Sequence, residues 1–405
     1  MYGHHLYHSV ERPVCACYPF PMHTNITNRR VVVAMSGGVD SAVAALLLKE
    51  QGYDVVGVTM RLFPYDDHDG LTSYNKGCCT LQDVDDARRV CQIIGAPHYL
   101  MNFEREFQTH VIDYFCQEYA RGRTPHPCLA CNDKIKFSFL LQRALALDAG
   151  YVATGHYARV SYENGSWHLL KGVDATKDQS YVLYTLHQQE LERTLFPVGS
   201  YAKTEIRAMA QRAGLPVAGK PDSQEICFIP SGDYRRFLAE HLTPQPGEIV
   251  DSQGNVLGHH QGIEQFTVGQ RKGLGIASGK PLYVLAVDAG TRRVVVGTAQ
   301  ELLQDTLRAS QVNYPAGAPE GPMEVQAKVR YKASEMPATL FPRGSEAVIR
   351  FHEPQRAVTP GQAVAFYVGE ELLGGGTIEG AWQESLEGAG STTSSVKSAE
   401  GGVLI

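Results

Sequence analysis

The chain has 405 residues, of which 43% are hydrophobic and 20% are charged. This length allows two or three domains with their own cores, and the composition is that of a soluble globular protein. A net charge of −6 argues against indiscriminate nucleic-acid binding. We find no uninterrupted apolar run that could span a bilayer, so no membrane association is expected.

The nine cysteines are odd in number and irregularly spaced, which does not fit a disulfide framework. They favour reduced thiols in a cytoplasmic protein. Cys91 and Cys116 lie in helical patterns, and we expect them to be buried thiols.

Both ends of the chain predict little structure. Residues 1–28 lack the apolar core of a signal peptide and are interpreted as a disordered extension. Residues 384–405 are rich in Gly, Ser and Thr, which predicts a disordered tail.

Between these ends, strand and helix patterns alternate up to about residue 230, which predicts a parallel sheet covered by helices on both faces. The expected strands are 29–35, 53–60, 97–103 and 151–160, and the expected helices are 42–52, 80–95, 104–120 and 137–150. We therefore predict an α/β domain over 29–230. Strand–turn–strand patterns then predict a small β-containing middle domain over 231–300 and a C-terminal β-barrel over 301–383.

The segment "AMSGGVDS" (34–41) follows the first expected strand and opens a helix. A Gly-rich turn and a helix N-terminus favour bound phosphate, whereas the lysine of a Walker A motif is missing. The candidate ATP-binding residues here are Ala34, Met35, Ser36, Gly37, Gly38, Val39, Asp40 and Ser41. Asp40 is also the candidate ligand for Mg²⁺ on the phosphates. Met60 and Gly155 end later strands and are expected at the adenine or ribose.

Three further cysteines raise the question of sulfur chemistry. Cys128 and Cys131 lie three apart in "GRTPHPCLACNDKIKF" (122–137), and Cys227 lies in "KPDSQEICFIP" (220–230). A structural zinc site usually needs four ligands, and a redox CxxC is expected in a fold of its own. Reactive thiols beside an adenylating loop suggest sulfur transfer to an activated oxygen.

The motifs together resemble a known family. "MSGGVDS", "GRTPHPCLACNDKIKF", "ATGHYAR", "KDQSYVLY", "FPVGSYAKTEIR", "DSQEICFIP", "FTVGQRKGLG" and "KVRYK" occur in the order found in bacterial tRNA-specific 2-thiouridylases, over roughly 29–380. These enzymes belong to the pyrophosphate-loop ATP pyrophosphatase superfamily. The resemblance implies a Rossmann-like, adenine nucleotide α-hydrolase-like first domain. It also implies synthesis of 2-thiouridine at the wobble position of tRNAs for Lys, Glu and Gln, with ATP, Mg²⁺ and a persulfide from a cysteine desulfurase relay.

The resemblance also implies residue roles. Cys131 matches the nucleophile and Cys227 the persulfide carrier, and the two would form a transient disulfide. Cys128 departs from family members that have Asp at this position. The positions that match contacts to the target base or the tRNA are His126, Pro127, Cys128, His156, Lys177, Asp178, Gln179, Ser180, Arg330, Tyr331 and Gln362.

Three alternatives stay open at this point. Cys128, Cys131 and Cys227 could hold a [4Fe-4S] cluster whose fourth iron binds sulfide. The adenylating loop could serve an amidating or ligating enzyme, as in argininosuccinate or GMP synthetases. A non-catalytic RNA-binding module is the third alternative.

Overall fold

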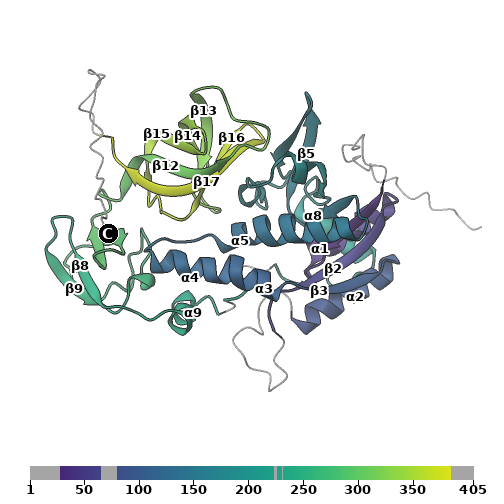
Figure 1. The fold of residues 1–405 in the computed structure, drawn as a ribbon, viewed down its shortest axis with the longest axis horizontal. Coiled ribbons are helices and arrows are strands. Elements are labelled where there is room, and N and C mark those ends of the chain that lie inside the picture. Colours follow the sequence, from purple (N-terminus) through teal and green to yellow (C-terminus); the bar gives the residue numbers. More distant parts are fainter. Residues whose placement is uncertain (1–27, 65–79, 223–225, 230, 385–405) are drawn as a thin grey trace, which may run out of the picture.

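The computed structural model describes residues 28–64, 80–222, 226–229 and 231–384. The extension and tail expected to be disordered therefore lie outside the described residues, except for Asn28 and Glu384. Figure 1 shows the parallel sheet and the small β8–β9 sheet at opposite ends of the long axis, with α4 running between them.

The first domain contains the expected parallel sheet, in the order β3-β2-β1-β4-β7. All four neighbouring pairs are parallel. The strands are β1 (Arg30–Ala34), β2 (Asp54–Arg61), β3 (His98–Asn102), β4 (Tyr151–Ala153) and β7 (Thr194–Leu195). The order changes direction between β1 and β4, which is where open α/β sheets bind ligands at their carboxyl edge.

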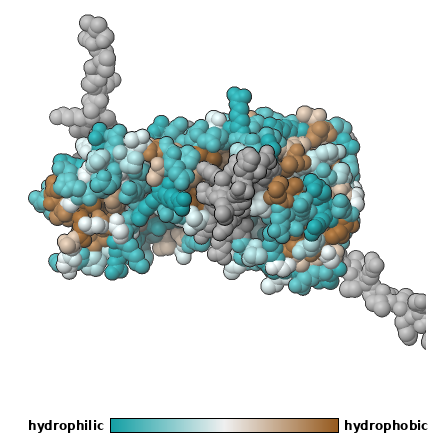
Figure 2. All heavy atoms as spheres, turned by 90° about the horizontal axis from the view of Figure 1, so that it is seen from below, coloured by the Kyte–Doolittle hydropathy of each residue, from teal (hydrophilic) through white to brown (hydrophobic). Residues whose placement is uncertain are grey.

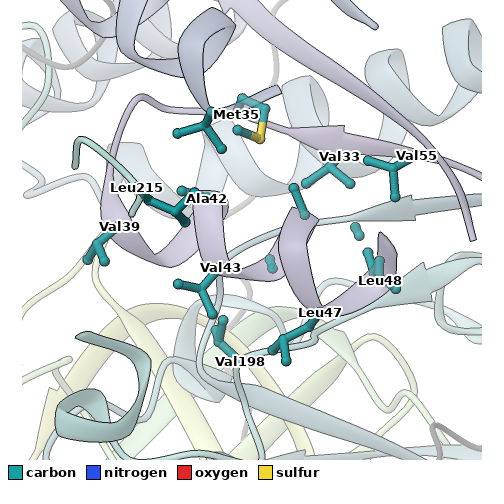
Figure 3. Packing of buried hydrophobic residues seen from close by; sticks show 14 of the residues in the cluster. Val33, Met35, Val39, Ala42, Val43, Leu47, Leu48, Val55, Val198 and Leu215 are labelled. Atoms are coloured by element: carbon teal, nitrogen blue, oxygen red, sulfur yellow. The ribbon is translucent and has the colours of Figure 1, made fainter. Parts of the chain in front are cut away.

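Helices cover both faces of this sheet, because side chains along each strand alternate between the faces. Val31 and Val33 of β1 pack with α1 (Val39–Glu50), α2 (Leu81–Ile94) and α8 (Lys203–Arg212). Figure 3 shows this packing around Val33, Val43 and Leu47.

Val32 and Ala34 belong to a second cluster on the other face, which we call the lower cluster. Helices contribute Phe107, Phe115 and Ile135 to this cluster. The contributing helices include α3 (Glu104–Phe107), the π-helix η1 (Gln108–Ile112), α4 (Asp113–Ala120), the π-helix η2 (Cys131–Leu140) and α6 (Leu141–Ala146). The short helix α5 (Pro127–Ala130) directly precedes η2. Cys91 and Cys116 are buried on opposite faces, as expected.

Two expected elements were wrong in their bounds. The helix expected over 137–150 begins earlier, because α5 and η2 already wind residues 127–140. The strand expected over 151–160 ends at Ala153, and the chain then turns close to α1 at Gly155. It resumes as β5 (Ala158–Glu163), which pairs with β6 (Ser166–Lys171) in a different sheet.

The remaining short elements of the first domain lie after β6. They are the 3-10 turn η3 (Ser180–Val182) and α7 (Gln188–Glu192), which flank the segment 183–187. The middle region then has a four-stranded sheet in the order β10-β11-β8-β9. Its elements are α9 (Tyr234–His241), β8 (Gly247–Val250), β9 (Val256–His260), η4 (Ile263–Gln265), β10 (Tyr283–Asp288) and β11 (Arg293–Gly297).

The C-terminal region forms a closed six-stranded antiparallel barrel, as expected. The barrel closes because β12 pairs with both β15 and β17. β17 also pairs with β6 at Glu371 and Leu170, so a hairpin of the first domain extends the barrel sheet. The strands are β12 (Leu303–Asn313), β13 (Met323–Lys328), β14 (Met336–Arg343), β15 (Glu346–Arg356), β16 (Ala363–Val368) and β17 (Glu371–Trp382).

The face of the molecule shown in Figure 2 is largely hydrophilic, with apolar side chains in small separate groups. Across the described ranges, every helix is too short or too polar to cross a bilayer.

Candidate active site

The phosphate-binding loop links β1 to α1 at the carboxyl edge of the sheet. Gly38 caps α1 with extended backbone and no side-chain cap, so the first N–H groups of the helix are left to a ligand. Ser41 is buried, and its hydroxyl accepts from the N–H of Ser36 at 3.2 Å and donates to the carbonyl of Gly38 at 3.1 Å. These bonds fix the turn from within, while Ser36 stays exposed.

Two glycines let neighbouring segments approach this loop. Gly37 has φ +70°, and a Cβ there would lie 2.5 Å from the carbonyl oxygen of Asp83 at the start of α2. Gly155 follows β4, and a Cβ there would lie 2.7 Å from the backbone nitrogen of Ser41. A larger residue at either position would displace the loop, so both glycines are required by close backbone contact. The structure thus places Gly155 beside the loop, and its contact with the adenine or ribose stays a prediction.

Asp40, in the first turn of α1, is bonded by two buried side chains. Lys203 donates to its two carboxylate oxygens at 2.7 and 2.8 Å, and the Tyr157 hydroxyl donates at 2.7 Å. Burial and the neighbouring carboxylate raise the pKa of Tyr157 far above its usual value, so this hydroxyl is a permanent donor. The same tyrosine exchanges two hydrogen bonds with Gln179.

Lys203 also connects the loop to Asp222. The ammonium lies 2.9 Å from an Asp222 carboxylate oxygen, and Lys177 and Arg207 bind the same carboxylate at 2.9 and 2.8 Å. Burial acts in the opposite direction, but hydrogen bonds from Lys177 and Lys203 lower the pKa of Asp222 to about 2. Asp222 is therefore ionised at all physiological pH values.

Lys220 ties the same segment to the loop from a second side. Its ammonium donates to the carbonyl of Gly37 at 3.0 Å and pairs with Asp83 at 2.5 Å and Asp86 at 3.0 Å. The stretch 220–222 is thus anchored at the nucleotide loop. Cys227 follows five positions after Asp222.

Cys227 is half-buried, and the residue after it anchors the turn. Phe228 is fully buried and packs edge-on against Phe107 and Phe115. Cys227 itself packs against the lower cluster. Its side chain therefore borders the same apolar layer that lies beneath the sheet.

Cys131 borders that layer from a different element. It opens η2 and also packs against the lower cluster. The next residue, Asn132, is buried and donates to the carbonyl of Val182 at 3.1 Å, which fixes the start of the helix. π-Helical stretches are often found at functional sites. The lower cluster thus adjoins both cysteines and contains Met60, whose side chain is buried.

The residues expected near the target base gather around Tyr181. Its ring lies 5.8 Å from His126 and 6.2 Å from Tyr331, measured between ring centroids. Cys128, two positions after His126, is exposed and lies near Tyr331, whose pKa is raised first by burial and then by the charge of Asp178. Pro127, which precedes Cys128, is buried. Segments from the first domain and the barrel therefore meet at this surface.

Other residues expected to contact tRNA have internal partners. The Asp178 carboxylate accepts from Gly172 and from both the N–H and the hydroxyl of Ser180. Ser180 is fully buried against Tyr367. Lys177 is 39% exposed and is the side chain of this segment best placed to reach a ligand while bound to Asp222.

His156 is buried beside the loop region, although it was expected near the tRNA. Its Nδ1 lies 2.7 Å from the Thr154 hydroxyl and its Nε2 3.5 Å from the Lys136 ammonium. Burial and Lys136 lower its pKa well below the usual value, so the imidazole is neutral. A contact between this side chain and tRNA stays a prediction.

The barrel holds the segment that precedes the cysteine pair. Gln362 donates to the carbonyls of Thr124 and Pro125, both at 3.0 Å, and Thr124 N–H donates to the carbonyl of Pro360. Arg123 is bonded to Glu379 of β17 at 2.5 Å. These contacts place residues 123–125 directly on the barrel.

Arg123 also pairs with the buried Glu118 at 2.7 Å, so it joins α4 to the barrel. Arg330 donates to the carbonyls of Arg356 and Ala357 at 2.9 and 2.7 Å. The residue as a whole is exposed, so its guanidinium is accessible to a phosphate beside these two hydrogen bonds.

The residues do not fit an iron–sulfur cluster in this arrangement. A cluster bound as expected needs three thiolates together. Among the residues the structure describes, which include Cys128, Cys131 and Cys227, no three His, Cys, Asp or Glu side chains gather as a metal site. We therefore derive no step through a cluster.

Comparisons with known proteins identify the family of the chain. Family models described as a tRNA methyl transferase HUP domain, a tRNA methyl transferase PRC-barrel domain and an aminomethyltransferase β-barrel domain match residues 29–231, 235–298 and 304–378. The tRNA-specific 2-thiouridylase MnmA of Heliobacterium modesticaldum is 52% identical over 356 residues, covering 86% of this chain and 92% of that protein. The chain belongs to the tRNA-specific 2-thiouridylase family.

Other relatives agree with this membership. The tRNA-specific 2-thiouridylase MnmA of Geobacter metallireducens is 50% identical and covers 89% of this chain and 100% of its own length. The family is one of ATP-binding pyrophosphate-loop proteins. A solved U34-tRNA thiolase NcsA from Methanococcus maripaludis matches at 16% identity and TM-score 0.31, covering 52% of this chain and 66% of its own, which is too low to carry an argument.

Several site residues were missed in the sequence. Lys203 and Asp222 lie inside motifs that were used only for their resemblance, "FPVGSYAKTEIR" and "DSQEICFIP". Tyr157, Tyr181 and Lys220 also lie inside quoted stretches, but no role was assigned to them. Their side chains come together only through the tertiary fold, because the partners lie more than 100 positions apart for Asp40–Tyr157 and Gly37–Lys220.

Proposed function

We propose that this protein is a tRNA-uridine 2-sulfurtransferase that makes 2-thiouridine at the anticodon wobble position. One observation carries the proposal: Cys131 and Cys227, from distant segments, border one apolar cluster beneath the sheet edge that bears the nucleotide loop. The family membership and the ATP loop support it. The tRNAs for Lys, Glu and Gln are the expected substrates, and the cytoplasm is the expected compartment.

The first step is adenylation of the uracil. The O2 oxygen attacks the α-phosphorus of ATP, a P–O bond forms, and pyrophosphate leaves. The N–H groups at the start of α1 would hold the pyrophosphate, since a helix N-terminus favours anions. The carboxylate of Asp40 suits Mg²⁺, but it would have to exchange Lys203 for the metal. When bound, Mg²⁺ would neutralise phosphate charge.

The second step is sulfur transfer. The upstream donor leaves a persulfide on Cys227, and the terminal sulfur is delivered to C2 while AMP leaves with the former O2 oxygen. The Cys131 thiolate attacks the inner sulfur of Cys227, which breaks the persulfide S–S bond and forms the Cys131–Cys227 disulfide. Sulfide release can precede or follow the attack on C2. A thiol reductant returns both cysteines to thiols.

The regions divide the work in this proposal. Residues 29–230 form the catalytic domain, 231–300 the middle domain and 301–383 the barrel, in line with the three family matches. The barrel would help to hold tRNA, because it supplies Tyr331 to the surface around Cys128.

The test is mass spectrometry of wobble uridine after incubation of tRNA with the protein, ATP and a sulfide source. We expect 2-thiouridine that depends on ATP and an equal amount of AMP. Absence of the thionucleoside with a persulfide donor and with sulfide alike would overturn the proposal. An amidated or ligated product would instead support the ligase alternative.

A further inference from the structure

Lys203 begins α8, and within the described ranges its ammonium is paired with the carboxylates of Asp40 and Asp222 and lies 5.7 Å from the centroid of the Tyr157 ring. Its side chain is only 10% exposed, and its ammonium lies between Asp40 and Asp222. A cation this buried needs an anionic partner, because an unpaired buried charge is strongly destabilising. The two carboxylates supply it.

The phosphate oxygens of ATP are anionic like the carboxylate oxygens that now bind Lys203, and they carry more negative charge. The N-terminus of α1 and the Ser/Gly turn offer dipoles but no formal positive charge. A departing pyrophosphate gains negative charge, and a nearby ammonium stabilises such charge strongly in a site screened from water. Lys203 is bonded to Asp40 in the first turn of α1, so its ammonium is within one side chain of that site.

We propose that Lys203 contacts the phosphates of ATP and that Asp222 is the counter-ion it exchanges for them. The proposal deepens the proposed function by naming the cation that accepts the pyrophosphate. Nucleotide binding would then weaken the Lys203–Asp222 contact and leave Asp222 with Lys177 and Arg207.

This exchange has a consequence for the sulfur side. Asp222 and Lys220 anchor the segment that leads to Cys227 at the nucleotide loop. Asp222 also holds Lys177, in the stretch expected to contact tRNA. One carboxylate thus links the nucleotide site, a tRNA-facing lysine and the carrier segment. ATP occupancy would remove one partner of the carboxylate that these three share.

The test is equilibrium binding of inorganic pyrophosphate and of ATP, measured by calorimetry on the full chain without tRNA. Lys203→Met should weaken pyrophosphate binding by about 10- to 100-fold, the cost of one charge-assisted contact. Lys203→Arg should restore most of it. Lys49→Met is the matched control, because Lys49 lies at the other end of α1 and donates to the carbonyl of Gly95.

Asp222→Asn should change pyrophosphate affinity in the direction opposite to Lys203→Met, which a merely structural role of Asp222 would not produce. Removing the competing carboxylate should tighten pyrophosphate binding by about 3- to 10-fold, because the Lys203–Asp222 ion pair no longer has to be broken. Asp85→Asn, which alters only an exposed pair with Arg88, should change nothing. Thermal unfolding of each variant confirms that it is folded.

The outcomes separate this inference from the proposed function. Unchanged affinity in Lys203→Met, or unchanged or weaker binding in a folded Asp222→Asn, overturns the exchange. Thiolation by the wild-type protein is measured separately. If the wild type makes no 2-thiouridine but Asp222→Asn still binds pyrophosphate more tightly, the exchange stands while the proposed function falls.

Discussion

The segments that carry the two cysteines proposed to transfer sulfur are held by different parts of the molecule. The residues before Cys131 are bonded to the C-terminal barrel through Arg123 and Gln362. The residues before Cys227 are bonded to the nucleotide loop through Lys220 and Asp222. One cysteine segment is thus anchored on the barrel, which is expected to hold tRNA, and the other at the ATP loop. If the proposed sulfur transfer is right, it depends on both regions being in place.

The largest effect should come from the cysteines themselves. Cys131→Ser and Cys227→Ser should each eliminate thiolation, because a hydroxyl neither carries a persulfide nor matches a thiolate as nucleophile. AMP formation should survive, since ATP chemistry lies at a separate loop. A tRNA-thiolation assay with parallel AMP measurement checks both.

Cys128→Asp is the matched variant for that pair. It should keep measurable thiolation, because Cys128 is exposed and matches Asp in other family members. If it is as inactive as Cys131→Ser, and ultraviolet–visible and Mössbauer spectra of anaerobically purified wild type show a cluster that the variant loses, the relay is wrong.

Asp40→Ala should abolish AMP formation while sparing most tRNA binding. The change removes the carboxylate that holds Lys203 and Tyr157 at the loop. ATP-dependent AMP release in the presence of tRNA reports it. Wild-type AMP formation by this variant would contradict the assignment of the loop.

Arg123→Met should remove the ion pairs that join α4 to the barrel. It leaves the buried Glu118 and the half-buried Glu379 without this guanidinium. We expect a loss of stability of about 2–4 kcal/mol by chemical denaturation and a fall in thiolation of about tenfold or more. AMP formation should fall less.

Arg121→Met is the control for that change, since Arg121 is 68% exposed and contacts the same Glu118 at 3.3 Å. It should be nearly neutral, as exposed pairs contribute little. Equal loss in both variants would contradict a specific role for the barrel contact.

A smaller effect is expected at Arg330. Replacing it by Met should weaken the binding of all cognate tRNAs alike. It should also reduce the steepness of log affinity against log salt by about one unit. Arg88→Met, on α2 outside the barrel, should leave the slope unchanged. An unaltered slope in Arg330→Met would limit its role to the hydrogen bonds with Arg356 and Ala357.

The smallest effect concerns pH. Burial lowers the pKa of His126 to about 4, below the usual 6.5. A lowered folded-state pKa means that the neutral form stabilises the fold; this stability is present above pH 6.5 and is lost as the pH falls toward about 4. The free energy of unfolding should therefore drop more steeply between pH 6.5 and 4 in the wild type than in His126→Gln. Parallel curves would contradict the burial of this imidazole.

The sequence predicted the features that contiguous residues encode. The nucleotide loop, the parallel sheet and the barrel follow from local patterns, because strand alternation and a Ser/Gly turn repeat familiar geometry. The early start of the helical stretch at Pro127 was missed, since the π-helix that continues it from Cys131 has no periodic signature in these residues. The ion pairs of Asp222 were missed for another reason: Lys203 and Arg207 lie on α8 and Lys177 lies before η3, and only folding brings them to this carboxylate.

The most direct test of the account follows the oxygen that sulfur replaces. A cognate tRNA whose wobble uracil carries an isotope label at O2 is incubated with the wild-type protein, ATP and a persulfide donor. Mass spectrometry then measures 2-thiouridine and the label in AMP. The account predicts one labelled AMP for each thionucleoside formed. Thiolation with unlabelled AMP, or no thiolation with a competent donor, would contradict it.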